Sequence, residues 1–298
     1  LKYVLSGRES MDDMAQANAE GVTIKAQLMP RAIGMLLGAE LTLNPFYTTA
    51  TYAALAKLPL AAKLAEMRKP EVRARILAEP IDPDPALVLG RMVRDFGHMF
   101  VLGDPPNYEQ PADRSIAALA AARGVTAEEL AYDMLTEGES GGKLYLAMAN
   151  YPDCSLDSVG TILSHPDVVL GLGDGGAHVG TICDGSYSTF ALAHWARDRK
   201  VGRFAVEDIV RRMTGATAAL IGLDDRGRSS PGKRAERNVI DVDHRSVASP
   251  EVRYDMPAGG RRLMQRASGY TATLVNGEVV YRNGEATGAL PGRLVRTA

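Results

Sequence analysis

The chain has 298 residues, and 34 basic against 36 acidic side chains give it a formal charge of −2. This balance argues against a nucleic acid as partner, because nucleic-acid binding depends on a strongly basic surface, and the apolar stretches are too short or too interrupted by lysine to cross a membrane. With 46% hydrophobic residues the composition is that of a globular protein, and the length suggests about two domains or one large barrel with an appendage.

The amino-terminal region predicts a helix followed by a strand. Residues 12–20 have a helical pattern that ends at Gly21, and residues 22–28 are rich in β-branched side chains before Met29 and Pro30 stop the strand. Residues 1–8 contain no apolar run as long as a secretory signal needs, and Cys154 and Cys183 are too few for a disulfide framework. We therefore expect a cytoplasmic protein.

A long helical region follows the strand. From about residue 44 to residue 160 the chain is rich in alanine, and prolines separate helices predicted near residues 52–58, 60–66, 71–78, 113–123 and 127–136. Thr126 and Glu129 have the spacing of a capping box at the start of the last of these helices.

The most informative segment is residues 165–178. Its continuous apolar run, bounded by Pro166 and by glycines, predicts a strand buried on both faces, as in a parallel sheet. Asp174 lies at the carboxyl end of this strand, just before Gly175 and Gly176. Parallel sheets of α/β proteins place their reacting groups at this end. Asp-Gly-Gly is equally typical of a turn in which the aspartate bonds its own backbone, and periodicity leaves both interpretations open.

Helices are predicted next, over residues 188–199 and 206–220, and the pattern then changes near residues 223–228. The remaining segment alternates short apolar runs with turns and includes a strand at residues 238–242. Asn276-Gly277 between alternating apolar residues predicts a hairpin over residues 271–281. The last part of the chain is therefore expected to form a small β module.

A set of short segments follows in order along the second half of the chain: Gly173-Asp174-Gly175-Gly176-Ala177-His178, Cys183-Asp184, Trp195-Ala196-Arg197-Asp198, Leu223-Asp224-Asp225-Arg226-Gly227, Pro231-Gly232, Val275-Asn276-Gly277-Glu278-Val279-Val280 and Thr287-Gly288-Ala289-Leu290-Pro291-Gly292-Arg293. As a set they resemble the amidohydrolase-3 group, which includes the N-acyl-D-amino-acid deacylases, or D-aminoacylases. Residues 27–31, with residues 44–46, are similar to the segment around that family's seventh barrel strand. The resemblance covers nearly the whole chain.

This resemblance implies an α/β fold in which residues 1–224 form the C-terminal part of a metal-dependent-hydrolase (β/α)8 TIM barrel, with a large helical insertion at about residues 44–160. Residues 225–298 would form a small β-sandwich module. The implied cofactor is zinc, as one or two ions. The resemblance places Asp174 beside the zinc, as a metal ligand and as the general base and acid of catalysis. There it would take a proton from the attacking water and pass it to the departing amine.

The rest of a zinc site is not recognisable in this sequence. The family takes its other ligands from a His-x-His on the first strand, from a bridging residue on a later strand and from histidines on strands five and six. Neither that spacing nor a helical i, i+4 pair occurs among the five histidines, His98, His165, His178, His194 and His244. Only two convincing parallel strands precede the β module. We therefore expect the missing ligands upstream of Leu1, and a chain that is one half of a longer enzyme and inactive by itself.

Two further residues are candidates for binding the substrate. His178 follows Asp174 by four residues and could face a substrate, with packing inside the loop as an equal alternative. Arg31 follows the first predicted strand, where its guanidinium could hold a substrate carboxylate with two hydrogen bonds. A helix-capping or surface role for Arg31 fits the sequence equally well.

The leading functional hypothesis is metal-dependent hydrolysis of a linear amide C–N bond, with an N-acyl amino acid or a related small molecule as substrate. The helical insertion and the Gly-Ala-His sequence favour it over a cyclic-amide hydrolase of the hydantoinase or dihydroorotase type, which shares the aspartate. A non-catalytic protein that keeps the sheet and the β module as a binding or structural element is the alternative of a different class. The oligomeric state stays open.

Overall fold

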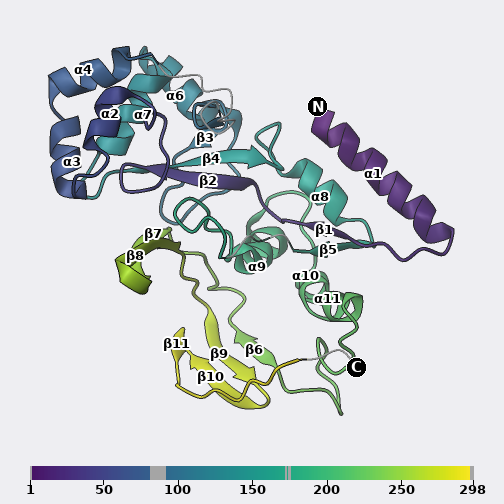
Figure 1. The fold of residues 1–298 in the computed structure, drawn as a ribbon. Helices are drawn as coiled ribbons and strands as arrows, with labels where there is room; N and C mark the ends of the chain where they lie inside the picture. Colours follow the sequence, from purple (N-terminus) through teal and green to yellow (C-terminus); the bar gives the residue numbers. More distant parts are fainter. Residues whose placement is uncertain (1, 81–91, 172, 174–175, 296–298) are drawn as a thin grey trace.

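The computed structural model describes residues 2–80, 92–171, 173 and 176–295, and they form a mixed α/β fold (Figure 1). A short parallel sheet lies between an α/β lobe and a separate set of β-strands near the carboxyl terminus. Within the described residues, no helix is long and apolar enough to cross a bilayer.

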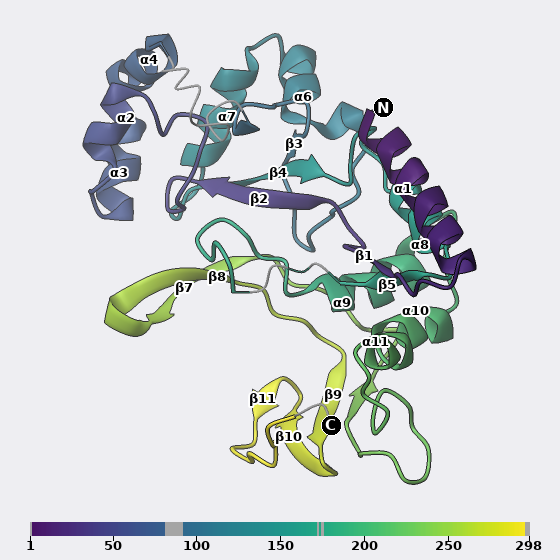
Figure 2. The same ribbon diagram turned by 45° about the vertical axis from the view of Figure 1, so that its right-hand side comes forward.

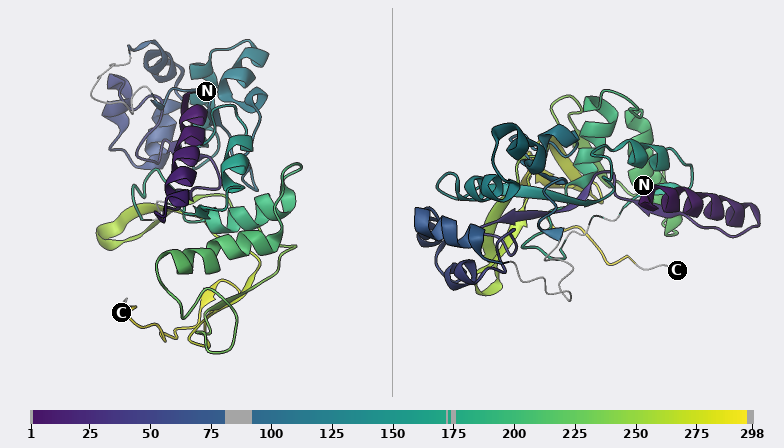
Figure 3. Two further views of the ribbon diagram at one scale, coloured as in Figure 1. Left: turned by 90° about the vertical axis from the view of Figure 1, so that its right-hand side faces the viewer. Right: turned by 90° about the horizontal axis from the view of Figure 1, so that it is seen from above.

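The first helix, α1 (Lys2–Ala19), lies beside α8 (Asp157–Leu163) at the edge of the molecule (Figure 3). It begins earlier than the pattern at residues 12–20 indicates. The strand expected at residues 22–28 starts only at Ala26. The reason is the Asn18 side chain, which accepts from the Ile24 N–H at 2.7 Å and donates to the Ile24 carbonyl at 3.0 Å. These bonds hold the chain against the helix end and leave the Ile24 side chain partly exposed.

The parallel sheet consists of β1 (Ala26–Leu28) and β5 (Val168–Leu170), with Gln27 opposite Val169. All three residues of β5 are buried. The prediction of a buried strand in a parallel sheet is therefore confirmed for β5. Because β1 and β5 pair directly, the chain between them is an excursion that leaves the sheet and returns to it.

That excursion forms an α/β lobe with its own apolar core. Its antiparallel sheet has the order β2-β4-β3, and helices gather on one side of this sheet (Figure 2). The strands are β2 (Ile33–Gly38), β3 (Met99–Phe100) and β4 (Lys143–Ala149), and the helices are α2 (Ala50–Leu55), α3 (Leu60–Met67), α4 (Pro70–Ala78), η1 (Ala112–Arg114), α6 (Ile116–Arg123) and α7 (Ala127–Thr136).

The helices of this lobe match their sequence signals, whereas its sheet was not predicted. The capping box is present, because the Thr126 hydroxyl accepts from the Glu129 N–H and the Glu129 carboxylate accepts from the Thr126 N–H. In contrast, four consecutive residues of β4 are buried. A strand with no polar alternation cannot be told from a buried helix by periodicity, which is why residues 44–160 predict a mainly helical insertion.

A second core surrounds the parallel sheet. The predicted helix at residues 188–199 is a short α-helix, α9 (Tyr187–Phe190), continued by the π-helix η2 (Ala191–Asp198). Trp195 of η2 is fully buried and donates its indole N–H to the Pro30 carbonyl at 2.6 Å. The predicted helix at residues 206–220 is divided at Thr214 into α10 (Val206–Met213) and α11 (Gly215–Leu220).

The carboxyl-terminal strands form one sheet and one ribbon. The sheet has the order β11-β10-β9-β6, and β7 pairs with β8. The predicted hairpin between β9 and β10 is confirmed, with Asn276 and Gly277 both at positive φ in its turn. The elements are β6 (Arg237–Ile240), β7 (Glu251–Met256), η3 (Pro257–Gly259), β8 (Gly260–Met264), β9 (Tyr270–Val275), β10 (Glu278–Arg282) and β11 (Glu285–Ala286).

The described part of the chain does not by itself confirm two expectations about architecture, the β-sandwich and the (β/α)8 barrel. A sandwich needs a second sheet packed against the first, but the described carboxyl-terminal strands form a single sheet beside the β7–β8 ribbon. A closed barrel needs eight strands, and the parallel sheet described here has two. The β-sandwich and the (β/α)8 barrel therefore stay predictions.

Candidate functional site

The candidate site lies where β1 and β5 end. Parallel pairing brings both carboxyl ends to one edge of the sheet, and the Gly171 N–H extends the pairing by donating to the Leu28 carbonyl at 3.1 Å. Asp174, the proposed base and metal ligand, lies outside the described residues, so its role stays a prediction. The segment that follows β5, residues 171–186, is called the β5 loop below.

Gly173 and Gly176, the nearest described residues before and after Asp174 in the sequence, are glycines for different reasons. A β-carbon on Gly173 would overlap the Tyr187 ring and lie 3.2 Å from the Asp184 carbonyl oxygen. Gly176 has φ +100°, a conformation that other residues rarely adopt. The β5 loop thus has a close packing contact on one side of Asp174 and a left-handed turn on the other.

His178 lies on the exposed surface of the β5 loop, in the left-handed conformation with φ 48°. Its carbonyl accepts from the N–H groups of Thr181 and Ile182 at 2.8 and 2.9 Å, which closes a tight turn. This exposure leaves the side chain accessible to a ligand. Substrate binding by His178 stays a prediction.

Arg31 faces the protein interior and is only 1% exposed. Its guanidinium donates to the Asp184 carboxylate, to the Cys183 carbonyl at 2.9 Å and to the Ser186 hydroxyl at 3.3 Å. Burial acts to lower the pKa of Arg31, but interactions with tyrosine and aspartate neighbours outweigh it and raise the pKa above its usual value. A substrate carboxylate would have to replace Asp184, so the substrate-clamp role of Arg31 stays a prediction.

Tyr108 and Gln265 complete a buried polar cluster around Arg31. The Arg31 guanidinium carbon lies 4.0 Å from the centre of the Tyr108 ring. The Gln265 amide donates to the Tyr108 hydroxyl at 2.8 Å, and its oxygen accepts from the Ser186 hydroxyl. The sequence offered no signal for this cluster, because its members come from four distant segments. Asp184 belonged to a motif without an assigned role, and Arg31 was a candidate for substrate binding, but nothing in the sequence indicated that the two residues meet.

The two cysteines are unpaired thiols, and neither has the character of a reactive group. Burial raises the pKa of Cys183 to about 11, although the nearby Arg31 acts to lower it. Burial also raises the pKa of Cys154. Thiols that stay protonated at neutral pH are poor nucleophiles and poor metal ligands.

A second, partly buried network joins Glu109 to His194 and Arg199. The Glu109 carboxylate accepts from His194 at 2.6 Å, from Arg199 at 2.9 Å and from the Leu156 N–H at 2.9 Å. Burial acts to raise the pKa of Glu109, but these hydrogen bonds outweigh it and lower the pKa to about 2. His194 also stacks on the Phe190 ring at 4.6 Å. His194 is therefore a structural residue that ties η2 to the α/β lobe.

The remaining histidines do not assemble a metal centre. His98 bonds Asp95, His244 bonds Asp241, and His165 lies just before β5, at the opposite end of the strand from Asp174. Within residues 2–80, 92–171, 173 and 176–295, no group of three or more histidine, cysteine, aspartate and glutamate side chains could hold a metal ion. The described residues therefore do not fit the implied zinc ion.

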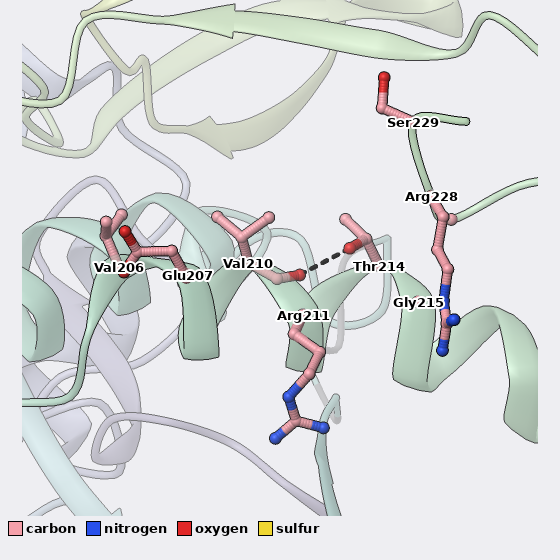
Figure 4. Close-up of a pocket in the computed structure, with 9 residues that line it drawn as sticks. Val206, Glu207, Val210, Arg211, Thr214, Gly215, Arg228 and Ser229 are labelled. Carbon is pink, nitrogen blue, oxygen red and sulfur yellow. Dashed lines mark hydrogen bonds between the residues drawn. The ribbon is translucent and has the colours of Figure 1, made fainter. Parts of the chain in front are cut away.

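A cavity of about 640 Å³ lies away from the strand edge, beside α10 (Figure 4). The buried Ile209 and Arg212 of α10 belong to the face that packs on β5, and Arg212 donates to the Val168 carbonyl at 3.2 Å. Figure 4 shows Val210 and Thr214 on the cavity side of the helix. The other lining residues are Val206, Glu207, Arg211, Gly215, Gly227, Arg228 and Ser229. This cavity is thus separate from the candidate site.

Comparison with known proteins gives one family match, covering residues 4–281, to the Amidohydro_3 model of the amidohydrolase family. A curated relative, the D-aminoacylase of Alcaligenes xylosoxydans xylosoxydans, is 31% identical over 194 residues, which are 64% of this chain and 36% of the relative. The chain thus spans about a third of the length of that relative.

Solved structures of D-aminoacylase are also similar to the chain. A D-aminoacylase mutant in complex with copper chloride is 26% identical and matches 67% of this chain and 38% of its own, with a TM-score of 0.36. A crystal structure of D-aminoacylase, described as defining a novel subset of amidohydrolases, is 27% identical and matches 65% and 36%, again with a TM-score of 0.36.

Proposed function

The chain belongs to the amidohydrolase family, and from that membership we propose that it acts in the metal-dependent hydrolysis of a linear amide, as an N-acyl-D-amino-acid deacylase. The resemblance to the D-aminoacylase group, inferred from the sequence, is confirmed by the family match and by the similarity to a curated D-aminoacylase. The observation that carries the proposal is the parallel pairing of β1 and β5, which brings the β5 loop to the edge where such folds place their chemistry.

Asp174 is the proposed general base and acid. A carboxylate at this position would accept a proton from the water that attacks the amide carbonyl and then return it to the departing amine. In this family a bound metal lowers the pKa of that water; we propose zinc, as one or two ions. Because the described residues supply no ligand set for the ion, we derive no step through it.

The proposed substrate is a small N-acyl amino acid, and a cytoplasmic location belongs to the same proposal. A cyclic amide is the second candidate within the family, since Asp174 would serve both reactions. The full-length protein should therefore be assayed on N-acetyl-D-amino acids, on hydantoin and on dihydroorotate. We expect turnover of the linear amides, and turnover of cyclic amides alone would contradict the deacylase assignment.

The role of Asp174 is tested by the D174N variant, because asparagine keeps the side-chain shape and removes the proton acceptor. We expect kcat to fall by about 10²- to 10⁴-fold. D113N, at an exposed carboxylate of η1, is the matched control and should keep wild-type activity. Wild-type kcat in D174N would remove Asp174 from the mechanism. If the wild-type protein binds stoichiometric metal and D174N does not, Asp174 is a metal ligand. That result would also exclude the alternative of a non-catalytic protein without metal.

A further inference from the structure

Two Asn-Gly pairs lie in consecutive turns of the carboxyl-terminal sheet. Asn276-Gly277 joins β9 to β10, and Asn283-Gly284 joins β10 to β11 (Figure 2). The sequence contains no other Asn-Gly pair. Asparagine and glycine are favoured in two-residue hairpin turns because both positions need a positive φ. The same pair is also chemically unstable, since an asparagine side chain followed by a glycine can lose its amide nitrogen as ammonia.

This loss of ammonia needs the two residues of one pair and water as the only other reactant. The glycine nitrogen attacks Cγ of the asparagine and forms a C–N bond. The Cγ–Nδ2 bond breaks, and Nδ2 leaves as ammonia with the proton that the glycine nitrogen gives up. Water then adds to either carbonyl of the cyclic imide and breaks its bond to nitrogen, which leaves an α- or β-linked aspartate. Glycine favours the attack because it has no β-carbon beside its nitrogen.

The two turns have nearly the same backbone and the same exposure. The angle φ is 51° at Asn276 and 49° at Asn283, and the glycines that follow have φ 81° and 84°. All four residues are exposed. Backbone conformation and access of water therefore do not distinguish the two pairs, whereas their hydrogen bonds do.

Asn276 is held by hydrogen bonds at each group that would react. The Gly277 N–H donates to the Ala235 carbonyl at 2.9 Å, so the attacking nitrogen is already engaged. The Asn276 amide donates to the Pro291 carbonyl at 2.8 Å, and its oxygen accepts from Arg234 at 3.3 Å. Attack on Cγ would therefore break hydrogen bonds of both the nucleophile and the leaving group.

Asn283 lacks these restraints among the described residues. Its backbone N–H donates to the Thr271 carbonyl at 3.0 Å, which holds the turn in place. Within the described part of the chain, neither its side chain nor the Gly284 N–H makes a hydrogen bond. The side-chain amide can therefore rotate until Cγ faces the glycine nitrogen without losing a bond.

We propose that Asn283 is a site of spontaneous deamidation in the folded protein and that Asn276 is protected from the same reaction by its hydrogen bonds. The product makes the net charge of the chain one unit more negative. The new carboxylate lies at the edge of a surface cavity of about 600 Å³, which Asn283, Glu285 and Arg266 help to line. This modification does not depend on the proposed hydrolase activity.

The test follows both pairs in one sample of the full-length protein, kept at mildly alkaline pH. Trypsin cleaves after Arg282 and so separates the two pairs into different peptides. Mass spectrometry of these peptides over time measures the conversion of each amide to a carboxyl group. We expect conversion at Asn283 to be about 10- to 100-fold faster, since two ordinary hydrogen bonds must open at Asn276. Equal rates, or a faster reaction at Asn276, would overturn the proposal.

Urea-unfolded protein is the control for the influence of neighbouring residues. Unfolding removes the hydrogen bonds and leaves the sequence unchanged, so the two rates should come within about threefold of each other. A ratio of rates that stays the same in urea would assign the difference to the preceding residues, Val275 and Arg282, and would contradict protection by hydrogen bonds.

The variants N283D and N276D locate the reaction by charge. Aspartate has nearly the shape of asparagine and also tolerates positive φ, so both variants keep their turns while each removes one amide. Ion-exchange chromatography of aged N276D should show an acidic fraction that grows as in wild type. In N283D this growth should be about tenfold slower. Growth at the wild-type rate in N283D would mean that another residue reacts and would exclude Asn283 as the site.

Discussion

Two arginines of this protein are each 1% exposed, yet they lie in opposite electrostatic surroundings. Arg31 has hydrogen-bond acceptors for both terminal nitrogens and an aromatic ring beneath it. All three guanidinium nitrogens of Arg245 lack a hydrogen-bond partner among the described residues. Burial lowers the pKa of Arg245, whereas the pKa of Arg31 is raised. Burial alone therefore does not determine whether a charged side chain stabilises the fold. Its hydrogen-bond and ion-pair partners determine that.

The largest effect is expected for R31M. Methionine fills a similar volume but leaves the Asp184 carboxylate in the interior without its cation, which costs about 3–5 kcal/mol. Urea unfolding should therefore show a large loss in the free energy of unfolding. A loss below about 1 kcal/mol would mean that water or another group takes over the role of Arg31.

Glu109 is a partly buried anion that, like Arg31, has charged partners, so the same reasoning about partners applies to it. E109Q removes the charge that His194 and Arg199 share, and we expect a loss of about 2–4 kcal/mol at pH 7. The pKa of Glu109 is lowered to about 2 in the folded protein, from an ordinary value of 4.5. Its contribution to stability is therefore complete above pH 4.5 and is lost as the pH falls toward 2.

The measurement for Glu109 is the Tm of wild type and E109Q from pH 7 to pH 2.5. The gap between the two should narrow as the solution becomes acidic. E128Q is the control, because Glu128 pairs with Arg94 in a half-exposed position and should contribute less than about 1 kcal/mol. A difference in Tm between wild type and E109Q that does not change with pH would contradict the stabilising role of the ionised Glu109 carboxylate.

The double variant R31M/D184L sharpens the comparison, since it removes both buried charges and replaces them with apolar side chains. Such replacements are often close to neutral, so the double variant should lie within about 2 kcal/mol of wild type and be more stable than R31M alone. The single variant D184L should be measured as well. A loss in the free energy of unfolding of the double variant equal to the sum of the losses in R31M and D184L would contradict this expectation.

The smallest effect, and of opposite sign, is expected for R245M. The described part of the chain makes no hydrogen bond to this guanidinium that the substitution would break, and the desolvation cost of the buried charge disappears. The variant should be as stable as wild type or more stable by up to about 1 kcal/mol. A loss above about 2 kcal/mol would show that Arg245 has an anionic partner in solution.

Parts of the candidate site could be predicted, and parts could not. Asp174 and His178 follow a buried strand in sequence, so the motif alone could nominate them. Arg31 could be nominated as well, but its surroundings could not be foreseen, because Asp184 and Tyr108 reach it from distant segments. From the sequence, Arg31 is expected to be a free cation at a strand end. In the structure it is one side of a buried ion pair with Asp184.

The sequence by itself determined the local elements of this protein: the helix that begins with Thr126 and Glu129, the hairpin at Asn276-Gly277 and the buried strand β5. The helix start and the hairpin depend on bonds and conformations within a few residues, and β5 was indicated by a continuous apolar run. Only the tertiary structure decided the pairing of β2 with β4, the partners of Arg31 and the lack of hydrogen-bond partners for Arg245 among the described residues. Burial and charge pairing depend on which distant segments meet, and the order of residues along the chain does not state that.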